Sequence, residues 1–296
     1  PLLNMEFLNQ QLGAQVWLKA ENLLPSGAYK YRGAMNKITS LIERYGKELR
    51  IVTASSGNHG MACALAARNL GVQANVVVPV STPQIKKDSI RALGANLVEV
   101  GATYDESFVS ACELAEKEHL YYVHPTSDRY TVGGQGTISL EILDQCPQVE
   151  QIVVPIGGGG LITGIALTMK TLKPSVKIYG VMPAGSAVYV ESRRQGQLVT
   201  LDHCSSMADA VVRKTGEEYL YPYIEKYVDD IFTVTEDSIR QAVRTACLYG
   251  KLTLEGSGAL ALAALLEKKC PLSPGTVLIC SGGNIDKAVL DLCMQA

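Results

Sequence analysis

One lysine, Lys30, stands between two aromatic residues in Pro25-Ser26-Gly27-Ala28-Tyr29-Lys30-Tyr31-Arg32-Gly33-Ala34, a run of turn-forming and small residues. A lysine amine attacks an aldehyde when desolvation or a neighbouring cation favours its neutral form, and Tyr29, Tyr31 and Arg32 could supply both effects. We therefore predict that Lys30 is the covalent anchor of an aldehyde cofactor. The alternative is a surface lysine whose stem lies along the rings, so the prediction needs a cofactor site elsewhere in the chain.

Four consecutive glycines, Gly157-Gly158-Gly159-Gly160, follow the apolar strand pattern Val153-Val154-Pro155-Ile156 and precede a helix pattern that starts at Leu161. A bare backbone at the start of a helix lets several N–H groups converge on an anion. This pattern predicts a phosphate site, and it is neither the dinucleotide fingerprint nor the P-loop, because no Gly-Lys-Ser/Thr follows. A plain tight turn is the alternative, but such a turn needs fewer glycines.

Two further turns carry short hydrogen-bonding side chains. Thr53-Ala54-Ser55-Ser56-Gly57-Asn58-His59-Gly60 joins a strand to a helix, and hydroxyl and N–H groups at a helix start suit a substrate carboxylate. Simple helix capping would explain the same residues. Cys280-Ser281-Gly282-Gly283-Asn284 follows the last predicted strand, where Ser281 either faces a ring nitrogen of a cofactor or belongs to an ordinary turn.

Alternating strands and helices must position these turns. Strands are predicted at Arg50–Thr53, Ala74–Val80, Asn96–Val100, Leu120–Val123, Gln151–Ile156, Lys177–Val181, Asp230–Val234 and Thr276–Cys280, as short apolar runs typical of sheets covered on both faces. Helices are predicted at Asn58–Leu70, Thr82–Leu93, Tyr104–His119, Gly136–Asp144, Leu161–Leu172, Ser186–Gly196, Glu217–Tyr227, Thr235–Leu252 and Gly258–Lys269. Thr82-Pro83 and Thr235 are predicted to begin their helices, with the proline at the first helical position. The alternation predicts an α/β fold with open, mostly parallel sheets.

Composition excludes several classes of protein. The chain has 296 residues, of which 47% are hydrophobic and 19% charged, and a net charge of −2. A folded enzyme is expected, with no nucleic-acid partner and no membrane partner, because no basic run or long apolar run occurs. The eight cysteines stand singly, which favours free thiols in the cytoplasm over disulfides or a metal site.

The motifs in order are Gly-Ala-Tyr-Lys-Tyr-Arg-Gly-Ala, Ser-Ser-Gly-Asn-His-Gly, Gly134-Gln135-Gly136-Thr137, the tetraglycine and Ser-Gly-Gly-Asn. Together they resemble the pyridoxal-phosphate enzymes of fold type II, the tryptophan-synthase-β-like fold, and within them the serine/threonine dehydratase and serine racemase group. The resemblance implies two open, mostly parallel twisted sheets flanked by helices. It also implies a small domain at 50–127, a large cofactor-binding domain made of 1–49 and 128–296, and a homodimer.

The resemblance assigns a role to each matching position. Lys30 would form the Schiff base with pyridoxal 5'-phosphate and then act as the base on the substrate Cα proton. The cofactor phosphate would be bound by Gly157, Gly158, Gly159, Gly160 and the amide of Leu161. The ring hydroxyl would contact Asn58, and the pyridine nitrogen would contact Ser281. Residues expected to bind substrate are Ser55, Ser56, Asn58, His59, His124 and Glu255. Glu255 could equally cap the helix that follows it.

Some positions depart from the family pattern. Ala28-Tyr29 replaces the usual Ser-Phe, and Ala210 replaces a glycine, which could narrow the substrate pocket. Met182 and Val188 stand where relatives place a glutamate and an aspartate that bind a divalent cation, so we predict that this metal site is absent. Arg213 either selects an acidic substrate such as 3-hydroxyaspartate or is an ordinary surface charge.

The expected reaction is loss of water from L-serine or L-threonine, followed by hydrolysis to a 2-oxo acid and ammonia. An amino-acid racemase is the alternative, because a serine at position 56 serves as a second acid/base in the family's racemases. Binding of the substrate carboxylate would also explain Ser56. A replacement enzyme of the cysteine-synthase kind fits the motifs less well, and a non-catalytic amino-acid sensor would have no need of Lys30.

Overall fold

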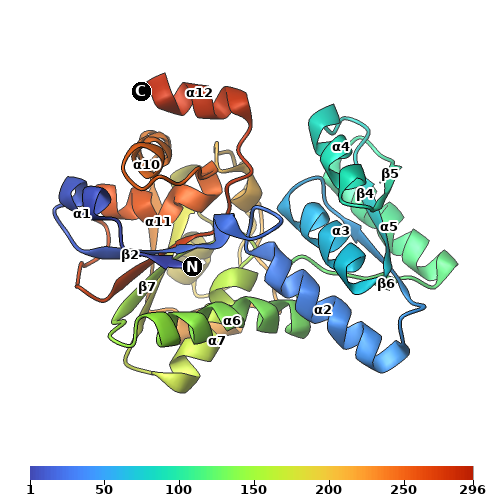
Figure 1. The fold of residues 1–296 in the computed structure, drawn as a ribbon, viewed down its shortest axis with the longest axis horizontal. Helices are drawn as coiled ribbons and strands as arrows, with labels where there is room; N and C mark the ends of the chain where they lie inside the picture. The colour runs from blue at the N-terminus through green and yellow to red at the C-terminus, as the bar shows by residue number, and fades with distance from the viewer. Residues whose placement is uncertain (296) are drawn as a thin grey trace. The chain divides into compact units, whose positions relative to one another are not determined.

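The computed structural model describes residues 1–295, which divide into two compact units (Figure 1). The larger unit contains Pro1–Gly27 and the chain from Gly136 onward, and the smaller unit is Ala28–Gln135. Each unit is built on its own sheet, as the predicted pair of mostly parallel sheets requires. The domain boundaries at 50 and 127 stay a prediction from the family resemblance.

The sheet of the larger unit has the strand order β1-β2-β10-β7-β8-β9. Its strands are β1 (Leu2–Leu3), β2 (Val16–Ala20), β10 (Thr276–Cys280), β7 (Gln151–Pro155), β8 (Lys177–Pro183) and β9 (Asp230–Val234). Only β1 runs antiparallel to its neighbour, and in the centre Leu278 of β10 pairs with Leu18 on one side and Val153 on the other. Because β2, β10, β7, β8 and β9 are parallel, the residues that follow them gather at one edge of the sheet, where α/β proteins place their ligands.

Helices cover both faces of this sheet, with α10 and α11 on one face and α7 on the other (Figure 1). The helix α11 (Gly256–Leu266) is apolar all round and buried from end to end, as expected for a helix packed between layers. The predicted cap is confirmed at α10 (Glu236–Leu248), where the Thr235 side chain accepts a hydrogen bond from the Ser238 N–H. The other helices of the unit are α1 (Glu6–Leu12), α7 (Gly160–Leu172), α8 (Val188–Gln195), α9 (Tyr221–Tyr227) and α12 (Lys287–Gln295).

The smaller unit has a parallel sheet with the order β5-β4-β3-β6. Its elements are α2 (Lys30–Tyr45), β3 (Arg50–Ala54), α3 (Asn58–Leu70), β4 (Gln73–Val78), α4 (Gln84–Ala92), β5 (Asn96–Glu99), α5 (Tyr104–Glu118) and β6 (Tyr121–Tyr122). Alternation along β3 sends Ile51 into the core shared with α2 and α3, and Val52 into the core shared with α5. The unit therefore has a helix layer on each face of its sheet.

Several sequence predictions of local structure were wrong. No helix was predicted before Asn58, but α2 begins at Lys30, directly after the turn-forming residues, and its Ala34, Ile38 and Leu41 form the buried stripe of an amphipathic helix. Pro83 is the residue before α4 and not its first helical residue. Helix α6 (Arg129–Gln145) begins seven residues earlier than expected, through glycines that usually disfavour helix. No helix among residues 1–295 is long and apolar enough to cross a membrane.

Candidate functional site

Lys30 is the first residue of α2 and is half-buried. Its Nζ donates a hydrogen bond to the carbonyl oxygen of Pro125 over 2.8 Å and lies 5.2 Å from the centroid of the Tyr29 ring. Pro125 follows β6, so the amine lies beside the carboxyl ends of the small unit's strands. The predicted anchor is thus held by a backbone carbonyl and an aromatic ring.

The turn after β3 brings Ser55, Ser56 and Asn58 to the same edge of that sheet. The Gly57 N–H donates to the Ser55 hydroxyl over 3.3 Å, and Asn58 is the first residue of α3. A Cβ at Gly60 would lie 2.1 Å from the Ser55 carbonyl oxygen, so only glycine allows this turn to close so tightly. The Ser56 hydroxyl makes no hydrogen bond among the described residues, which leaves its donor and acceptor capacity for a ligand.

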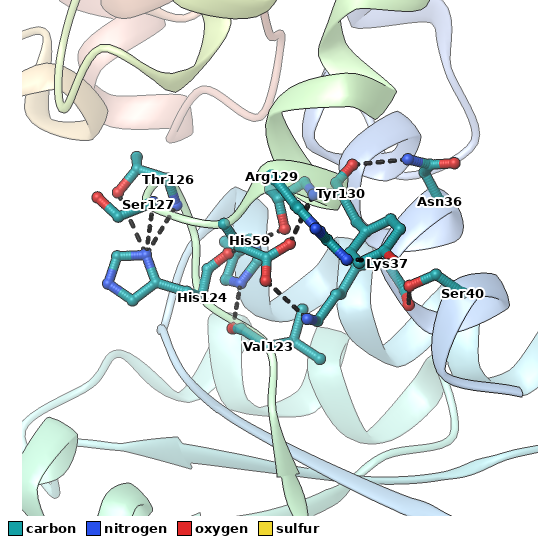
Figure 2. Close-up of polar contacts among 12 residues, drawn as sticks. Asn36, Lys37, Ser40, His59, Val123, His124, Thr126, Ser127, Arg129 and Tyr130 are labelled. Carbon is teal, nitrogen blue, oxygen red and sulfur yellow. Dashed lines mark hydrogen bonds and ion pairs between the residues drawn. The ribbon is translucent and has the colours of Figure 1, made fainter. Parts of the chain in front are cut away.

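His59 lies deeper, with 3% of its surface exposed. Its Nε2 is 3.0 Å from the carbonyl oxygen of Val123 (Figure 2). The same carbonyl also accepts a hydrogen bond from the Thr53 hydroxyl. Burial, followed by the nearby Lys30 ammonium, lowers the pKa of His59 to about 3. The imidazole is therefore neutral and donates to Val123, so a contribution of His59 to carboxylate binding would come from its backbone N–H at the start of α3.

His124 shapes the loop that carries Pro125. Its Nδ1 accepts hydrogen bonds from the N–H groups of Ser127 at 2.7 Å and Thr126 at 3.2 Å (Figure 2). An accepting Nδ1 places the proton of the neutral ring on Nε2. The role of His124 in substrate binding stays a prediction, whereas its hydrogen bonds with Thr126 and Ser127 hold the loop that contains Pro125, the acceptor of Lys30.

In the larger unit the tetraglycine follows β7 and leads into α7, which begins at Gly160. Gly159 has φ +93°, a left-handed conformation that suits glycine, and a Cβ on Gly157 would lie 2.9 Å from the Cα of Val211. Gly158 and Gly159 are buried, and neither N–H donates to a protein acceptor among residues 1–295. Because buried amides are almost always paired in folded proteins, this loop has the features of an anion site.

Ser281 lies at the same sheet edge, directly after β10, which pairs with β7. Its hydroxyl donates to the Ser257 carbonyl oxygen over 3.4 Å, and 4% of the residue is exposed. The Ser257 hydroxyl is itself buried and without a hydrogen-bond partner among the described residues. The Glu255 N–H donates to the Gly282 carbonyl, which brings Glu255 to the same turn; it precedes α11, but its side chain makes no capping bond.

These groups fit pyridoxal phosphate on the evidence of their own chemistry. The larger unit offers buried amides to a phosphate, and a buried hydroxyl without a partner beside Ser281 to a heteroaromatic nitrogen. The sequence prediction missed Ser257, although a short polar residue at a helix start was the same signal that identified the turn after β3. It also missed Pro125, because no sequence pattern identifies which carbonyl a lysine will contact.

The predicted absence of a metal site concerns Ser186 and its neighbours. Met182 and Val188 are fully buried. The Ser186 hydroxyl accepts from the Arg213 N–H at 3.0 Å and donates to the Arg213 carbonyl at 3.2 Å. No group of three or more His, Cys, Asp or Glu residues that could hold a metal ion occurs in the described part of the chain.

Comparison with known proteins gives a consistent result. L-threonine ammonia-lyase of Thermotoga maritima is 37% identical over 284 residues, which are 96% of this chain and 71% of that protein. Serine racemase of Rattus norvegicus is 39% identical over 303 residues, covering 100% of this chain and 91% of that protein. The solved structure of the processed form of threonine deaminase isoform 2 from Solanum lycopersicum has a TM-score of 0.93 at 36% identity, covering 100% of this chain and 87% of that one.

The sequence pattern of the family described as "Pyridoxal-phosphate dependent enzyme" matches residues 1–282. That range includes Lys30, the turn after β3, the tetraglycine and Ser281. The relatives carry two different activities at similar identity, so they do not agree on one reaction. The cofactor follows from the family. The chain belongs to the family of pyridoxal-phosphate-dependent enzymes.

Proposed function

We propose that this protein is an ammonia-lyase that converts L-serine or L-threonine to a 2-oxo acid and ammonia by α,β-elimination. The observation that carries the proposal is the Lys30 amine, which lies 2.8 Å from Pro125 at the edge where the polar turn after β3 also ends. A proton-transfer group beside a carboxylate-binding turn is what removal of a Cα proton requires. Family membership supplies the cofactor.

When bound, the pyridoxal group withdraws electrons from the substrate and makes its Cα proton acidic. Lys30 anchors the cofactor and, once released from it, takes the Cα proton on Nζ. The proton on Nζ would pass to the β-hydroxyl, which leaves as water while the electron pair at Cα forms the Cα–Cβ double bond. The resulting enamine would tautomerise to an imine, whose hydrolysis would give the 2-oxo acid and ammonia. As a free amine, Nζ is directed by the Pro125 carbonyl, which accepts a hydrogen bond from it.

The remaining predicted residues bind the cofactor or the substrate. Gly157 to Gly160 and the Leu161 amide hold the phosphate, Asn58 bonds the ring hydroxyl, and Ser281 offers the pyridine nitrogen a neutral hydroxyl. Ser55, Ser56 and the backbone at the start of α3 bind the substrate carboxylate, aided by the positive end of that helix. We also assign substrate binding to His124 and Glu255. We place the enzyme in the cytoplasm as a homodimer, for which light scattering would give about twice the chain mass of 31.8 kDa.

The test is to incubate pyridoxal-loaded protein with L-serine, L-threonine and L-threo-3-hydroxyaspartate, and to measure 2-oxo acid release and amino-acid chirality in the same samples. Oxo acid without D-enantiomer supports the lyase and identifies its substrate. Preference for 3-hydroxyaspartate would indicate that Arg213 binds the acidic side chain of the substrate. The proposal would be overturned if none of the three amino acids gave a product.

A racemase is the second candidate, and the half-buried Ser56 hydroxyl favours it because the described protein leaves that group able to carry a proton. D-serine formed with little oxo acid would establish this activity. The two reactions share removal of the Cα proton and differ in whether a proton returns to the opposite face or the β-substituent leaves.

A further inference from the structure

Tyr189 in α8 is fully buried, and its hydroxyl joins two backbone segments. The hydroxyl donates to the Gly158 carbonyl oxygen over 3.0 Å, and its oxygen accepts from the Glu217 N–H at 2.9 Å. Burial raises the pKa of Tyr189 far above its usual value, so the proton that Gly158 receives stays on the phenol at all ordinary pH. The phenol is therefore a fixed donor to the second glycine of the tetraglycine.

This contact determines where the next amide points. In a trans peptide the C=O of one residue and the N–H of the next point in opposite directions. The Tyr189 hydroxyl holds the Gly158 carbonyl toward α8. The Gly159 N–H of the same peptide therefore points to the opposite side of the loop, away from Tyr189. The Gly159 N–H, like that of Gly158, is a buried amide of this loop that donates to no protein acceptor among residues 1–295.

The ring has little freedom to turn away from the loop. A Cβ at Gly216 would lie 2.6 Å from the Tyr189 ring carbon Cζ, and the ring stacks on Tyr221 at 6.5 Å between centroids. On the loop side, a Cβ at Gly159 would lie 3.0 Å from the Tyr189 oxygen and 2.7 Å from Ile224. The close packing explains why glycine occupies both positions and keeps the hydroxyl at Gly158.

We infer that Tyr189 is a positioning residue for phosphate binding, which holds the Gly158–Gly159 peptide so that its N–H faces the cofactor phosphate. The inference rests on the proposed assignment of the phosphate to Gly157–Gly160. The direction of the amide donors in this loop would then be determined by α8, which contains Tyr189, and by the segment at Gly216 and Glu217 that packs against its ring and hydroxyl. Without the phenol, the peptide can rotate and its N–H no longer has a fixed direction.

The experiment compares two ligands that differ only in the phosphate. Cofactor is stripped from the holoenzyme, and pyridoxal phosphate and pyridoxal are titrated separately into wild type, Tyr189→Phe and Tyr221→Phe, following absorbance of the lysine adduct. Tyr221→Phe is the matched control, because it removes a hydroxyl from the stacked ring that donates to Ser192 and not to the loop. Thermal unfolding of each variant checks that the fold is retained.

We expect Tyr189→Phe to weaken pyridoxal phosphate about tenfold, equivalent to about 1.4 kcal/mol, while pyridoxal binding changes by less than about twofold. This size is typical of a buried hydrogen bond whose partners lose their contact. Gly216→Ala is a second variant that pushes the ring without removing its hydroxyl, and we expect the same phosphate-selective loss from it.

Equal weakening of both ligands by Tyr189→Phe, or no weakening of either, would overturn the inference. If wild type itself binds pyridoxal as tightly as pyridoxal phosphate, the assignment of the phosphate to the glycine loop fails instead, and the inference fails with it. The two failures are distinguished by the wild-type titrations alone.

Discussion

The Nζ of Lys30 donates to the Pro125 carbonyl oxygen over 2.8 Å, so the first residue of a helix is tied to the loop beyond the last strand of the same unit. The loop is held in turn by the His124 ring, whose Nδ1 accepts hydrogen bonds from the N–H groups of Thr126 and Ser127.

We predict that Lys30→Ala abolishes the covalent adduct with pyridoxal phosphate, measured by mass spectrometry after borohydride reduction, and lowers turnover by roughly 10⁴-fold or more. Lys37→Ala is the matched control from the same helix, because the Lys37 ammonium pairs with Asp128 at 2.6 Å. Loss of the adduct from both variants, or from neither, would contradict the assignment of Lys30.

The crossing of α2 and α6 inside the smaller unit depends on Gly134. A Cβ there would lie 2.6 Å from the Arg32 carbonyl oxygen and 2.7 Å from the Gly33 Cα, and these backbone atoms cannot give way. We predict that Gly134→Ala lowers the free energy of unfolding by about 1–3 kcal/mol, as overpacking does.

The neighbouring Gly133 is exposed, and a Cβ there would meet only Asn36 at 3.6 Å. Gly133→Ala should therefore raise the free energy of unfolding by up to about 1 kcal/mol through helix propensity. Denaturant unfolding of the two variants should show opposite signs, and a shared sign would mean that the crossing does not depend on Gly134.

The sequence predicted the sheets well where both faces of a strand are covered, because a strand such as β7 is then one continuous apolar run. It missed β2, since Lys19 interrupts that run. The structure shows why a lysine is tolerated there: Lys19 is fully buried and pairs with Glu141, with Gln145 also in reach of its ammonium. Such a partner, more than a hundred residues away, cannot be found by periodicity.

The same limit applies to the site. The polar turns were identified because glycines and hydroxyl residues between a strand and a helix are a local signal. The contact of Tyr189 with Gly158 joins residues 31 positions apart, and the partnerless Ser257 hydroxyl is defined only by what surrounds it. Local sequence therefore predicts the binding loops, whereas tertiary packing determines how they are held.

We predict that divalent cations have no effect on the segment around Ser186. Its hydroxyl already donates to and accepts from the backbone of Arg213, and Met182 and Val188 offer no oxygen ligand from their buried side chains. The melting temperature should be the same in excess EDTA and in millimolar Mg²⁺ or Ca²⁺. A rise that depends on cation concentration would reveal a bound ion, since a ligand specific to the folded state stabilises it by mass action.

Substitution of Ser56 separates the two candidate reactions. Ser56→Ala should keep 2-oxo acid release, at a lower kcat/KM, because the substrate carboxylate loses one hydroxyl partner while Lys30 still accepts the Cα proton. Any D-amino acid formed by the wild type should disappear. Ser55→Ala is the control, since the Ser55 hydroxyl is engaged with the Gly57 N–H and lies in the same turn. Loss of oxo acid from Ser56→Ala alone would assign Ser56 to the elimination itself.

His59 makes the folded protein sensitive to acid. Its pKa is lowered from 6.5 to about 3, chiefly by burial, so between these values the unfolded chain binds a proton that the folded chain does not. The free energy of unfolding then falls as pH drops below 6.5, by up to about 1.4 kcal/mol per pH unit, and the contribution is fully present above 6.5. His59→Gln keeps a donor for Val123 but does not titrate.

We therefore expect urea unfolding at pH 7, 5.5 and 4.5 to show a steeper loss of stability in the wild type than in His59→Gln. Acidic groups that lose ion pairs, such as Asp128 with Lys37, contribute equally to both proteins and cancel in the difference. Parallel pH profiles would mean that the imidazole takes up a proton in the folded state. In that case the His59 Nε2 could still donate to the Val123 carbonyl. The protonated imidazole would then place a second positive charge near Lys30, which favours the neutral form of the Lys30 amine that reacts.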